Sequence, residues 1–230
     1  MTDYKMEAAK AASKLIKAGQ TIGVGAGSTI AKLIRLIAAE CTFSSTLTLV
    51  SSSFNSSALI LKSGLNLKSA AAVDMLDIYF DGCDQFDTEL SALKSGGGIH
   101  TTEKILASMA DEFILIGDTG KFADQLNNIY PLVIEVIPAA LNTILQQITA
   151  SFPDAELRLR MSTEKDGAVI SEYGNYLIDI YFSQPVKPAE LNVKIKMIPG
   201  IVEHSLFYRM ATKAIVAGEE GIKILRPQYS

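Results

Sequence analysis

Three short segments carry most of the residues in this chain that could do chemistry. They span residues 23–29, 81–84 and 94–98, and Glu103 follows the last of them. The first holds glycines and hydroxyls, which suit an anion because backbone N–H groups can approach it closely. The other two hold carboxylates and a lysine, which suit acid and base chemistry. Together these residue types predict proton transfer on a small phosphorylated sugar.

The first segment reads Gly-Val-Gly-Ala-Gly-Ser-Thr and lies between a short apolar run and a helical pattern. A helix N-terminus adds partial positive charge, and Ser28 and Thr29 add hydroxyl donors, so a small phosphate is the favoured ligand. A dinucleotide-binding G-x-G-x-x-G pattern fails because its sixth position is Ser28, and no P-loop lysine follows at the required spacing. The alternative is a tight strand-to-helix turn in which Ser28 caps the helix.

The second segment places Asp81 and Asp84 directly after the apolar run 77–80. Two carboxylates at a strand end cost free energy unless they face solvent, cations or sugar hydroxyls. A solvated acidic turn is the alternative to a sugar site. A metal site is a weaker alternative, because neither His100 nor His204 has an obvious ligand partner at short spacing.

The third segment places Lys94 before a flexible run of glycines. Lys94 could neutralise nearby carboxylates or polarise a substrate oxygen, and the alternative is an ordinary surface lysine. Glu103 lies near the start of a predicted helix, where it could simply complement the helix dipole or complete a capping box. Lys121, after another strand end, and Lys5 are candidates for pairing with phosphate.

The composition excludes several classes of protein. The 230 residues are 48% apolar with a net charge of −4, which indicates a packed core and no nucleic-acid partner. The N-terminus lacks an apolar secretory core, and no apolar run reaches membrane-spanning length. Cys41 and Cys83 form no metal or redox spacing. We therefore expect a soluble cytoplasmic protein with no membrane partner.

The elements that must position these groups alternate between strands and helices up to about residue 130. Strands are predicted at 21–24, 47–50, 77–80 and 113–116, and helices at 4–18, around 30–37, up to 61 and at 102–109. Repeated βα units predict an α/β fold with a mostly parallel, doubly wound sheet. Ligands of such sheets bind outside the carboxyl ends of the strands, where residues 23–29 and 81–84 fall.

The pattern changes after residue 130. A strand at 132–137, a helix at 139–148, alternation over 157–161, a hairpin over 168–182 and a helix at 191–197 predict a small α+β domain with an antiparallel sheet. Strand-like runs at 214–216 and 222–225 could rejoin the first sheet. We predict one domain from residues 1–130 plus 201–230, and a second from residues 131–200.

The three segments, in this order, resemble those of the type A ribose-5-phosphate isomerase family. That family carries a Gly-x-Gly-Thr-Gly-Ser-Thr loop, an Asp-Gly-Ala-Asp-Glu segment, and a Lys-Gly-Gly-Gly loop with a glutamate nine residues after the lysine. Lys94 and Glu103 have that spacing. Residues 50–53, 136–138 and 198–201 also resemble family segments, so the similarity covers nearly the whole chain.

The resemblance implies a Rossmann-like domain, a small ferredoxin-like domain and a cofactor-free aldose–ketose isomerase of the non-oxidative pentose phosphate pathway, commonly dimeric or tetrameric. Glu103 would be the general base, and Lys94 would stabilise the negative charge that develops on oxygen. Asp81 and Asp84 would position hydroxyls and assist proton transfer between O1 and O2, and Lys121 would be a substrate contact. The remaining residues assigned to the sugar phosphate by this resemblance are Ala26, Gly27, Ser28, Thr29, Asp81, Gly82, Cys83, Asp84, Lys94, Ser95, Gly96 and Gly97.

The chain also differs from the family pattern beside the site. Ala26 replaces a threonine, Cys83 an alanine, Gln85 a glutamate, Ser95 a glycine and His100 an apolar residue. None of these removes a proposed proton-transfer group. Two hypotheses follow: an active isomerase, or a sugar-phosphate-binding paralogue with a regulatory role or an altered sugar specificity.

Overall fold

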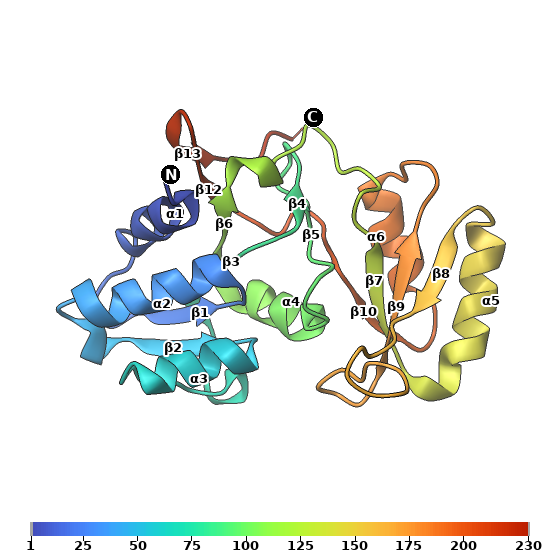
Figure 1. Ribbon diagram of the computed structural model, residues 1–230, viewed down its shortest axis with the longest axis horizontal. Coiled ribbons are helices and arrows are strands. Elements are labelled where there is room, and N and C mark those ends of the chain that lie inside the picture. Colours follow the sequence, from blue (N-terminus) through green and yellow to red (C-terminus); the bar gives the residue numbers. More distant parts are fainter. Residues whose placement is uncertain (1, 230) are drawn as a thin grey trace.

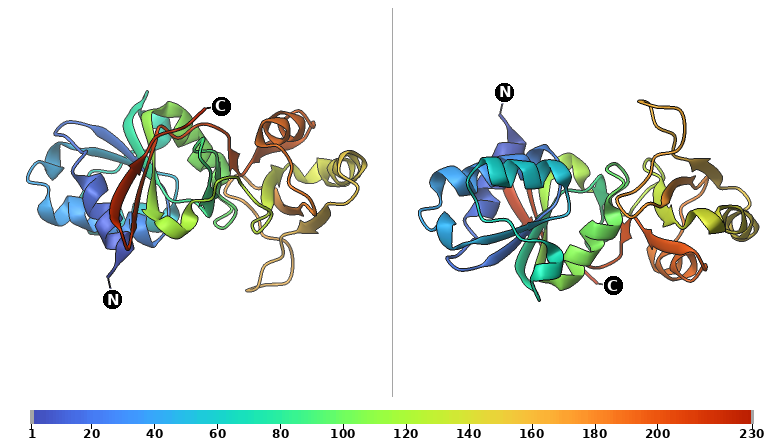
Figure 2. Two further views of the ribbon diagram at one scale, coloured as in Figure 1. Left: turned by 90° about the horizontal axis from the view of Figure 1, so that it is seen from above. Right: turned by 90° about the horizontal axis from the view of Figure 1, so that it is seen from below.

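The computed structural model describes residues 2–229 and contains two sheets side by side along its longest axis (Figures 1 and 2). The first has six strands in the order β13-β12-β6-β3-β1-β2, and all neighbours except β12 and β13 run parallel. Its strands are β1 (Thr21–Val24), β2 (Thr48–Ser51), β3 (Leu76–Asp81), β6 (Ala110–Asp118), β12 (Lys213–Gly218) and β13 (Gly221–Leu225).

Helices cover both faces of the first sheet. Side chains alternate between the two faces along each strand, and apolar side chains on each face pack against the helices there. On one face Ile78 and Phe80 pack with α1 (Tyr4–Ser13), α2 (Ser28–Glu40) and α3 (Phe54–Lys62). On the other face Tyr79 packs in a core with Leu106 of α4 (His100–Met109). The strands are therefore apolar on both faces, which leaves their ends as the place for polar groups.

The second sheet is antiparallel throughout, with the strand order β10-β7-β9-β8. Its strands are β7 (Leu132–Val136), β8 (Glu156–Leu159), β9 (Tyr176–Tyr181) and β10 (Ile201–His204). Ile144 and Ile148 of α5 (Leu141–Ser151) and Ile195 of α6 (Pro188–Lys196) complete its core. The predicted α/β class, a mostly parallel sheet plus a separate antiparallel sheet, is confirmed.

A small three-stranded sheet made of β11 (Leu206–Phe207), β5 (Ala92–Leu93) and β4 (Gln85–Phe86) connects the two larger ones. Its strands β4 and β5 lie in the part of the chain between Asp81, at the end of β3, and the start of α4. Because β5 ends at Leu93, the small sheet sets the position of Lys94 directly.

Some predicted elements differ from those observed. The first helix ends at Ser13 rather than at residue 18. In the predicted hairpin, residues 168–170 form only isolated bridges to their neighbours rather than a strand. The runs at 214–216 and 222–225 do rejoin the first sheet, but β10 pairs with β7 in the second sheet. The chain therefore returns to the first sheet later than residue 201, and the division into domains stays a prediction.

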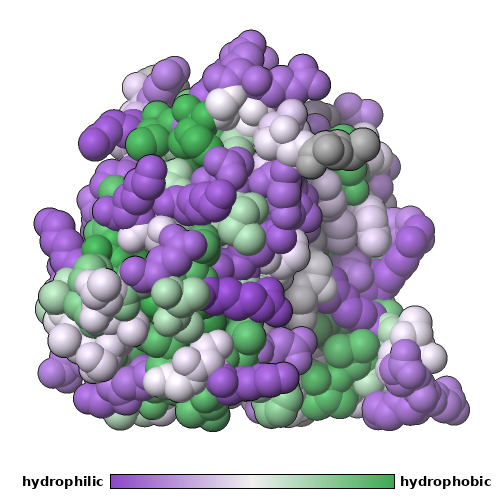
Figure 3. Space-filling view, turned by 60° about the vertical axis from the view of Figure 1, so that its left-hand side comes forward, coloured by the Kyte–Doolittle hydropathy of each residue, from purple (hydrophilic) through white to green (hydrophobic). Residues whose placement is uncertain are grey.

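The outer surface is mixed in character. Figure 3 shows the side of the molecule that lies at the left in Figure 1, where hydrophilic and hydrophobic side chains are interspersed. The exposed hydrophobic side chains include Phe54 and Leu61 of α3. Among residues 2–229, no helix has both the length and the apolar character needed to cross a bilayer.

Candidate active site

A cavity of about 350 Å³ opens where β1, β3 and β6 end at their carboxyl sides. This is the edge at which parallel α/β sheets bind their ligands. Residues from all three polar segments line it. The lining consists of Lys5, Ala26, Gly27, Ser28, Thr29, Gly82, Cys83, Asp84, Lys94, Gly96, Gly97, Glu103, Ile116, Gly117, Asp118 and Lys121.

The first two segments meet at Gly25 and Asp81. A Cβ atom added to Gly25 would lie 1.9 Å from Asp81 Oδ1, so no larger residue fits there. The next residue, Ala26, donates its backbone N–H to the same Oδ1 at 3.2 Å. The glycine thus lets the loop after β1 wrap around the carboxylate at the end of β3.

Asp81 is fully buried beneath the cavity and is surrounded by donors. Besides Ala26, Gly82 donates its N–H to Oδ1 at 2.8 Å, and the Tyr79 hydroxyl donates to Oδ2 at 2.5 Å. Burial, followed by the charges of Asp81 and Glu103, raises the pKa of Tyr79 well above its usual value, so this hydroxyl keeps its proton. These donors satisfy the oxygens of the buried Asp81 side chain.

Lys94 joins this carboxylate to the proposed base. Its ammonium Nζ lies 2.8 Å from Asp81 Oδ2 and 3.3 Å from Glu103 Oε1, and it also donates to the carbonyl of Gly82. Burial alone would lower the pKa of Lys94, but the two carboxylates hold it above its ordinary value. Lys94 is therefore a buried, permanently charged donor on the wall of the cavity.

Glu103 lies in the first turn of α4 and is 5% exposed. Burial raises its pKa to about 8, against the opposing effect of Lys94, and the charge of Asp81 raises it further. A carboxyl group with a pKa near the working pH is well matched to taking and returning a proton. The alternative role, that of a surface glutamate which only complements the helix dipole, does not fit a side chain this buried.

The remaining lining residues form a site suited to an anion. The chain enters α2 through Gly27, whose φ of +96° favours glycine, and Ser28 and Thr29 open the helix. Gly27 is the N-cap residue, so the capping role considered for Ser28 is not observed. Lys5 of α1 and Lys121, in the turn after β6, line the same cavity. Helix N–H groups, hydroxyls and two ammonium groups are the usual ligands of phosphate.

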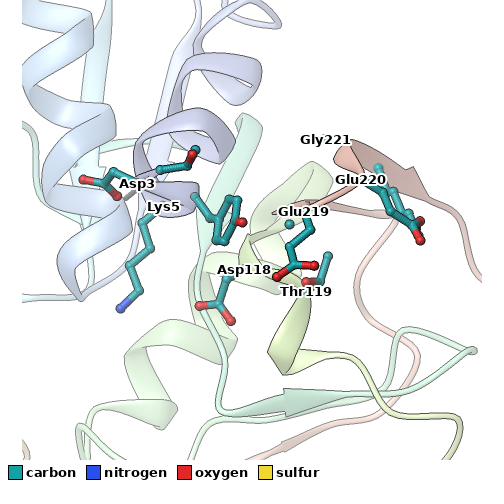
Figure 4. Close-up of a pocket in the computed structure, with 11 residues that line it drawn as sticks. Asp3, Lys5, Asp118, Thr119, Glu219, Glu220 and Gly221 are labelled. Carbon is teal, nitrogen blue, oxygen red and sulfur yellow. Dashed lines mark ion pairs between the residues drawn. The ribbon is translucent and has the colours of Figure 1, made fainter.

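A larger cleft of about 660 Å³ adjoins this cavity and shares Lys5 and Asp118 with it. It lies between the start of α1 and the turn that joins β12 to β13, where Figure 4 shows the carboxylates of Asp118 and Glu219 turned toward the same space. Four carboxylates, those of Asp3, Asp118, Glu219 and Glu220, line it. A phosphate is therefore better placed in the smaller cavity.

Asp84 and the glycine loop after Lys94 form another part of the wall. Asp84 Oδ2 accepts the N–H of Ser95 at 2.6 Å and that of Gly96 at 3.2 Å. Ser95, however, does not line the cavity, because its hydroxyl donates to the carbonyl of Pro131 at 2.6 Å. The structure thus brings Gly96 and Gly97 to the cavity and turns the Ser95 side chain away from it.

Three other residues that differ from the family pattern lie at or near the site. Gln85 is buried and accepts the N–H of Asn127 at 2.9 Å. His100 is fully buried, and burial lowers its pKa to about 4. Cys83 lines the cavity, and burial raises the pKa of its thiol to about 12, so the thiol is neutral. None of them displaces Lys94 or Glu103.

Sequence reasoning missed four residues of this region: Tyr79, Ile116, Gly117 and Asp118. Tyr79 and Asp81 are two residues apart on one strand and therefore share a face, which is a signal that could have identified the tyrosine. Residues 116–118 end a predicted strand, the same position that identified Asp81. Within residues 2–229 no group of three or more His, Cys, Asp and Glu side chains gathers as metal ligands.

Comparisons with known proteins agree with this geometry. The family model for ribose 5-phosphate isomerase A (phosphoriboisomerase A) matches residues 48–221. Ribose-5-phosphate isomerase A of Pyrococcus abyssi is 37% identical over 225 residues, which cover 97% of each chain. That of Thermosynechococcus vestitus is 36% identical and covers 94% of this chain and 91% of its own.

Solved structures agree as well. Ribose 5-phosphate isomerase A from Methanocaldococcus jannaschii superposes with a TM-score of 0.89 at 34% identity, over 97% of this chain and 98% of its own. A D-ribose-5-phosphate isomerase in complex with phospho-erythronic acid gives a TM-score of 0.91 at 34% identity, over 98% of this chain and 100% of its own. This chain therefore belongs to the ribose-5-phosphate isomerase A family of isomerases.

Proposed function

We propose that this protein interconverts ribose 5-phosphate and ribulose 5-phosphate through an enediolate, with Glu103 as the general base. The observation that carries the proposal is the buried contact of Lys94 with Glu103, at 3.3 Å, in the same cavity as the N-terminus of α2. One cavity thus offers a base, a cation and an anion site, which is what an open-chain sugar phosphate requires.

The reaction follows from these groups. The Glu103 carboxylate removes the proton on C2 of the open-chain aldose, and the C2–H electron pair forms the C1=C2 double bond. The carbonyl electrons move to O1, which gives the enediolate. A proton then passes from O2 to O1, the C2=O2 double bond forms, and Glu103 returns its proton to C1. The same atoms are redistributed, so no oxidant or reductant is consumed.

Lys94 stabilises the negative charge that develops on the substrate oxygens. A buried, preorganised cation acts strongly here because little water screens it. Asp84, which lines the cavity, positions the sugar hydroxyls and assists the transfer between O2 and O1. Asp81 lies beneath the surface, and in this proposal it holds Lys94 in place while its charge keeps the lysine protonated.

The phosphate binds at residues 26–29, with Lys5 and Lys121 as its counter-charges. The complex of a similar isomerase with phospho-erythronic acid supports a phosphorylated four- or five-carbon chain as the ligand class. Family membership further suggests a homo-oligomer that works in the cytoplasm in the non-oxidative pentose phosphate pathway. Light scattering of the purified protein tests the oligomeric part of this proposal.

The alternative is a paralogue that binds a sugar phosphate without converting it. The substitutions that motivate it have internal contacts: Ser95 with Pro131, and Gln85 with Asn127. They leave Lys94, Glu103, Asp81 and Asp84 in place, which favours the enzyme.

The experiment is conversion of ribose 5-phosphate by the purified protein without added metal, in H₂O and in D₂O, beside Glu103→Gln. We expect turnover, deuterium at C1 of ribulose 5-phosphate, and a loss of about 10²–10⁴-fold in kcat for the variant with substrate binding retained. Glu7→Gln, a change in α1 at a half-exposed side chain that pairs with Lys10, is the control. Binding without turnover in the wild type would establish the paralogue. Turnover with no deuterium uptake would exclude exchange through a solvent-accessible base.

A further inference from the structure

Arg160 links the second sheet to the catalytic glycine loop. It follows β8, and its guanidinium pairs with Asp179 of β9, with Nη2 2.5 Å from Oδ1 and Nε 3.2 Å from Oδ2. The same guanidinium donates to the carbonyl oxygens of Ser95 at 2.8 Å and Gly96 at 3.2 Å. Both charged side chains are mostly buried, at 18% and 15% exposed. One planar group thus connects a fixed strand to two successive carbonyls of the loop.

These two hydrogen bonds fix the orientation of two peptide groups. In a planar trans peptide the C=O of one residue and the N–H of the next point in opposite directions. Holding the Ser95 carbonyl therefore turns the Gly96 N–H away from Arg160, and this N–H is bonded to Asp84 Oδ2 at 3.2 Å. Holding the Gly96 carbonyl in the same way turns the Gly97 N–H away from Arg160. Gly96 and Gly97 both line the cavity.

Such a restraint matters because the loop is made of glycines. Glycine adopts backbone conformations that other residues rarely adopt. The peptide groups of residues 96–98 are therefore not held in one orientation by their own backbone. Gly98 has a φ of +68°, and a Cβ atom there would lie 2.6 Å from Leu177 and 3.4 Å from Arg160. The loop therefore packs directly on the second sheet, and Arg160 is the polar part of that contact.

Resting on the proposed function, we propose that Arg160 is a positioning residue for the isomerisation. It presets the N–H groups of Gly96 and Gly97, so that Asp84 is held in place and a donor faces the substrate oxygen on which negative charge develops. Arg160 acts from behind the loop and touches no substrate atom. Asp179 in turn orients the guanidinium.

Two variants separate positioning from folding. Arg160→Lys keeps the charge beside Asp179 but lacks the planar fork that reaches two carbonyls, and Arg160→Met removes the charge as well. Asp179→Asn tests the residue that orients the guanidinium. The matched control is Arg158→Met, two residues earlier in β8, because Arg158 is exposed and contacts Glu156 and the ring of Tyr181 rather than the glycine loop.

We expect kcat of both Arg160 variants to fall about 10- to 100-fold with KM changed less than about threefold, because a small misplacement of a catalytic group has effects of this size. Affinity for phospho-erythronic acid should fall about tenfold while inhibition by inorganic phosphate is unchanged, since only the reacting end is affected. Arg158→Met should match the wild type. If Arg160→Met does not fold, the kinetics of Arg160→Lys alone decide whether Arg160 positions the loop. A kcat within twofold of wild type in Arg160→Lys, or an equal loss of inorganic phosphate binding, would overturn the proposal.

A second measurement keeps this test independent of turnover. Hydrogen–deuterium exchange of peptides that cover residues 94–98 should be faster in Arg160→Lys than in the wild type, and unchanged in Arg158→Met. If the wild type does not convert ribose 5-phosphate, the proposed function fails, while exchange still decides whether Arg160 orders the loop. Unchanged exchange at 94–98 would show that it does not.

Discussion

The ammonium of Lys94 lies 3.3 Å from a carboxylate oxygen of Glu103, and each side chain is only 6% exposed. A cation this close would normally lower the pKa of a glutamate. Burial outweighs the lysine here and raises the pKa of Glu103 to about 8. The pair therefore combines a permanent positive charge with a carboxyl group that changes its protonation near neutral pH.

The first prediction concerns the pH dependence of activity. A general base works only when ionised, so kcat/KM should rise about tenfold per pH unit and level off above pH 8. Burial also lowers the pKa of Lys104 to about 8, so Lys104→Met is the necessary control. The inflection should persist in that variant. A rate–pH profile that inflects near 4.5 would contradict the raised pKa of Glu103.

The second prediction concerns stability. Folded Glu103 keeps its proton up to about pH 8, whereas an unfolded glutamate loses it near 4.5, so the folded state binds more protons in that window. The free energy of unfolding should therefore fall as pH rises from 4.5 to 8. Glu103→Gln lacks this group, so its Tm relative to wild type should increase from pH 5 to pH 8. Thermal unfolding at several pH values measures the difference, which should stay constant for Glu7→Gln. A constant difference for Glu103→Gln would refute the prediction.

The third prediction tests the contact between the first two segments. Gly25→Ala puts a Cβ atom 1.9 Å from Asp81 Oδ1, so the carboxylate must move away from Tyr79 and Lys94. We expect a loss of about 1–3 kcal/mol in the free energy of unfolding, as overpacking usually causes, and a large loss of kcat. Gly82→Ala is the comparison, because the nearest atom to its Cβ is the Ile116 carbonyl at 3.9 Å. Equal effects of the two variants on denaturant midpoints and kcat would argue against this contact.

The fourth prediction concerns the hydroxyl beneath Asp81. Tyr79→Phe keeps the ring that stacks on Phe113 at 5.2 Å but removes the donor to Asp81 Oδ2. We expect unfolding to require about 1.5 kcal/mol less, the usual value for a hydrogen bond to a charged group, and a several-fold lower kcat. Chemical denaturation and steady-state kinetics measure both. Tyr176→Phe, in the second sheet, makes the same chemical change away from the cavity. A Tyr79→Phe enzyme as stable and as active as that control would remove the tyrosine from this role.

The fifth prediction assigns the phosphate site. Lys121→Met should raise KM for ribose 5-phosphate about tenfold with little change in kcat, because a charge-assisted hydrogen bond to phosphate is lost in substrate and transition state alike. Lys10→Met is the control, since Lys10 is exposed and pairs with Glu7. A fall in kcat at constant KM would instead place Lys121 at the reacting end.

The agreement between sequence and structure is closest where the signal is local. The strand at 21–24, the stripe of Ile30, Leu33, Ile34 and Ile37, and the two later strands at 214–216 and 222–225 were predictable from periodicity. Periodicity records which face of an element is buried, and that is a property of neighbouring residues. The first two polar segments were recognisable for the same reason, because each follows an apolar run.

What the sequence alone determined is therefore the α/β class, the chemical groups of the candidate site and their place at strand ends. Only the tertiary structure decided that Asp81 lies beneath the cavity, that the Ser95 hydroxyl turns to Pro131, and that β10 pairs with β7. It also brought Arg160 to a loop 64 residues away. Contacts at such separations depend on how whole sheets pack against each other, and no local pattern of residues records that packing.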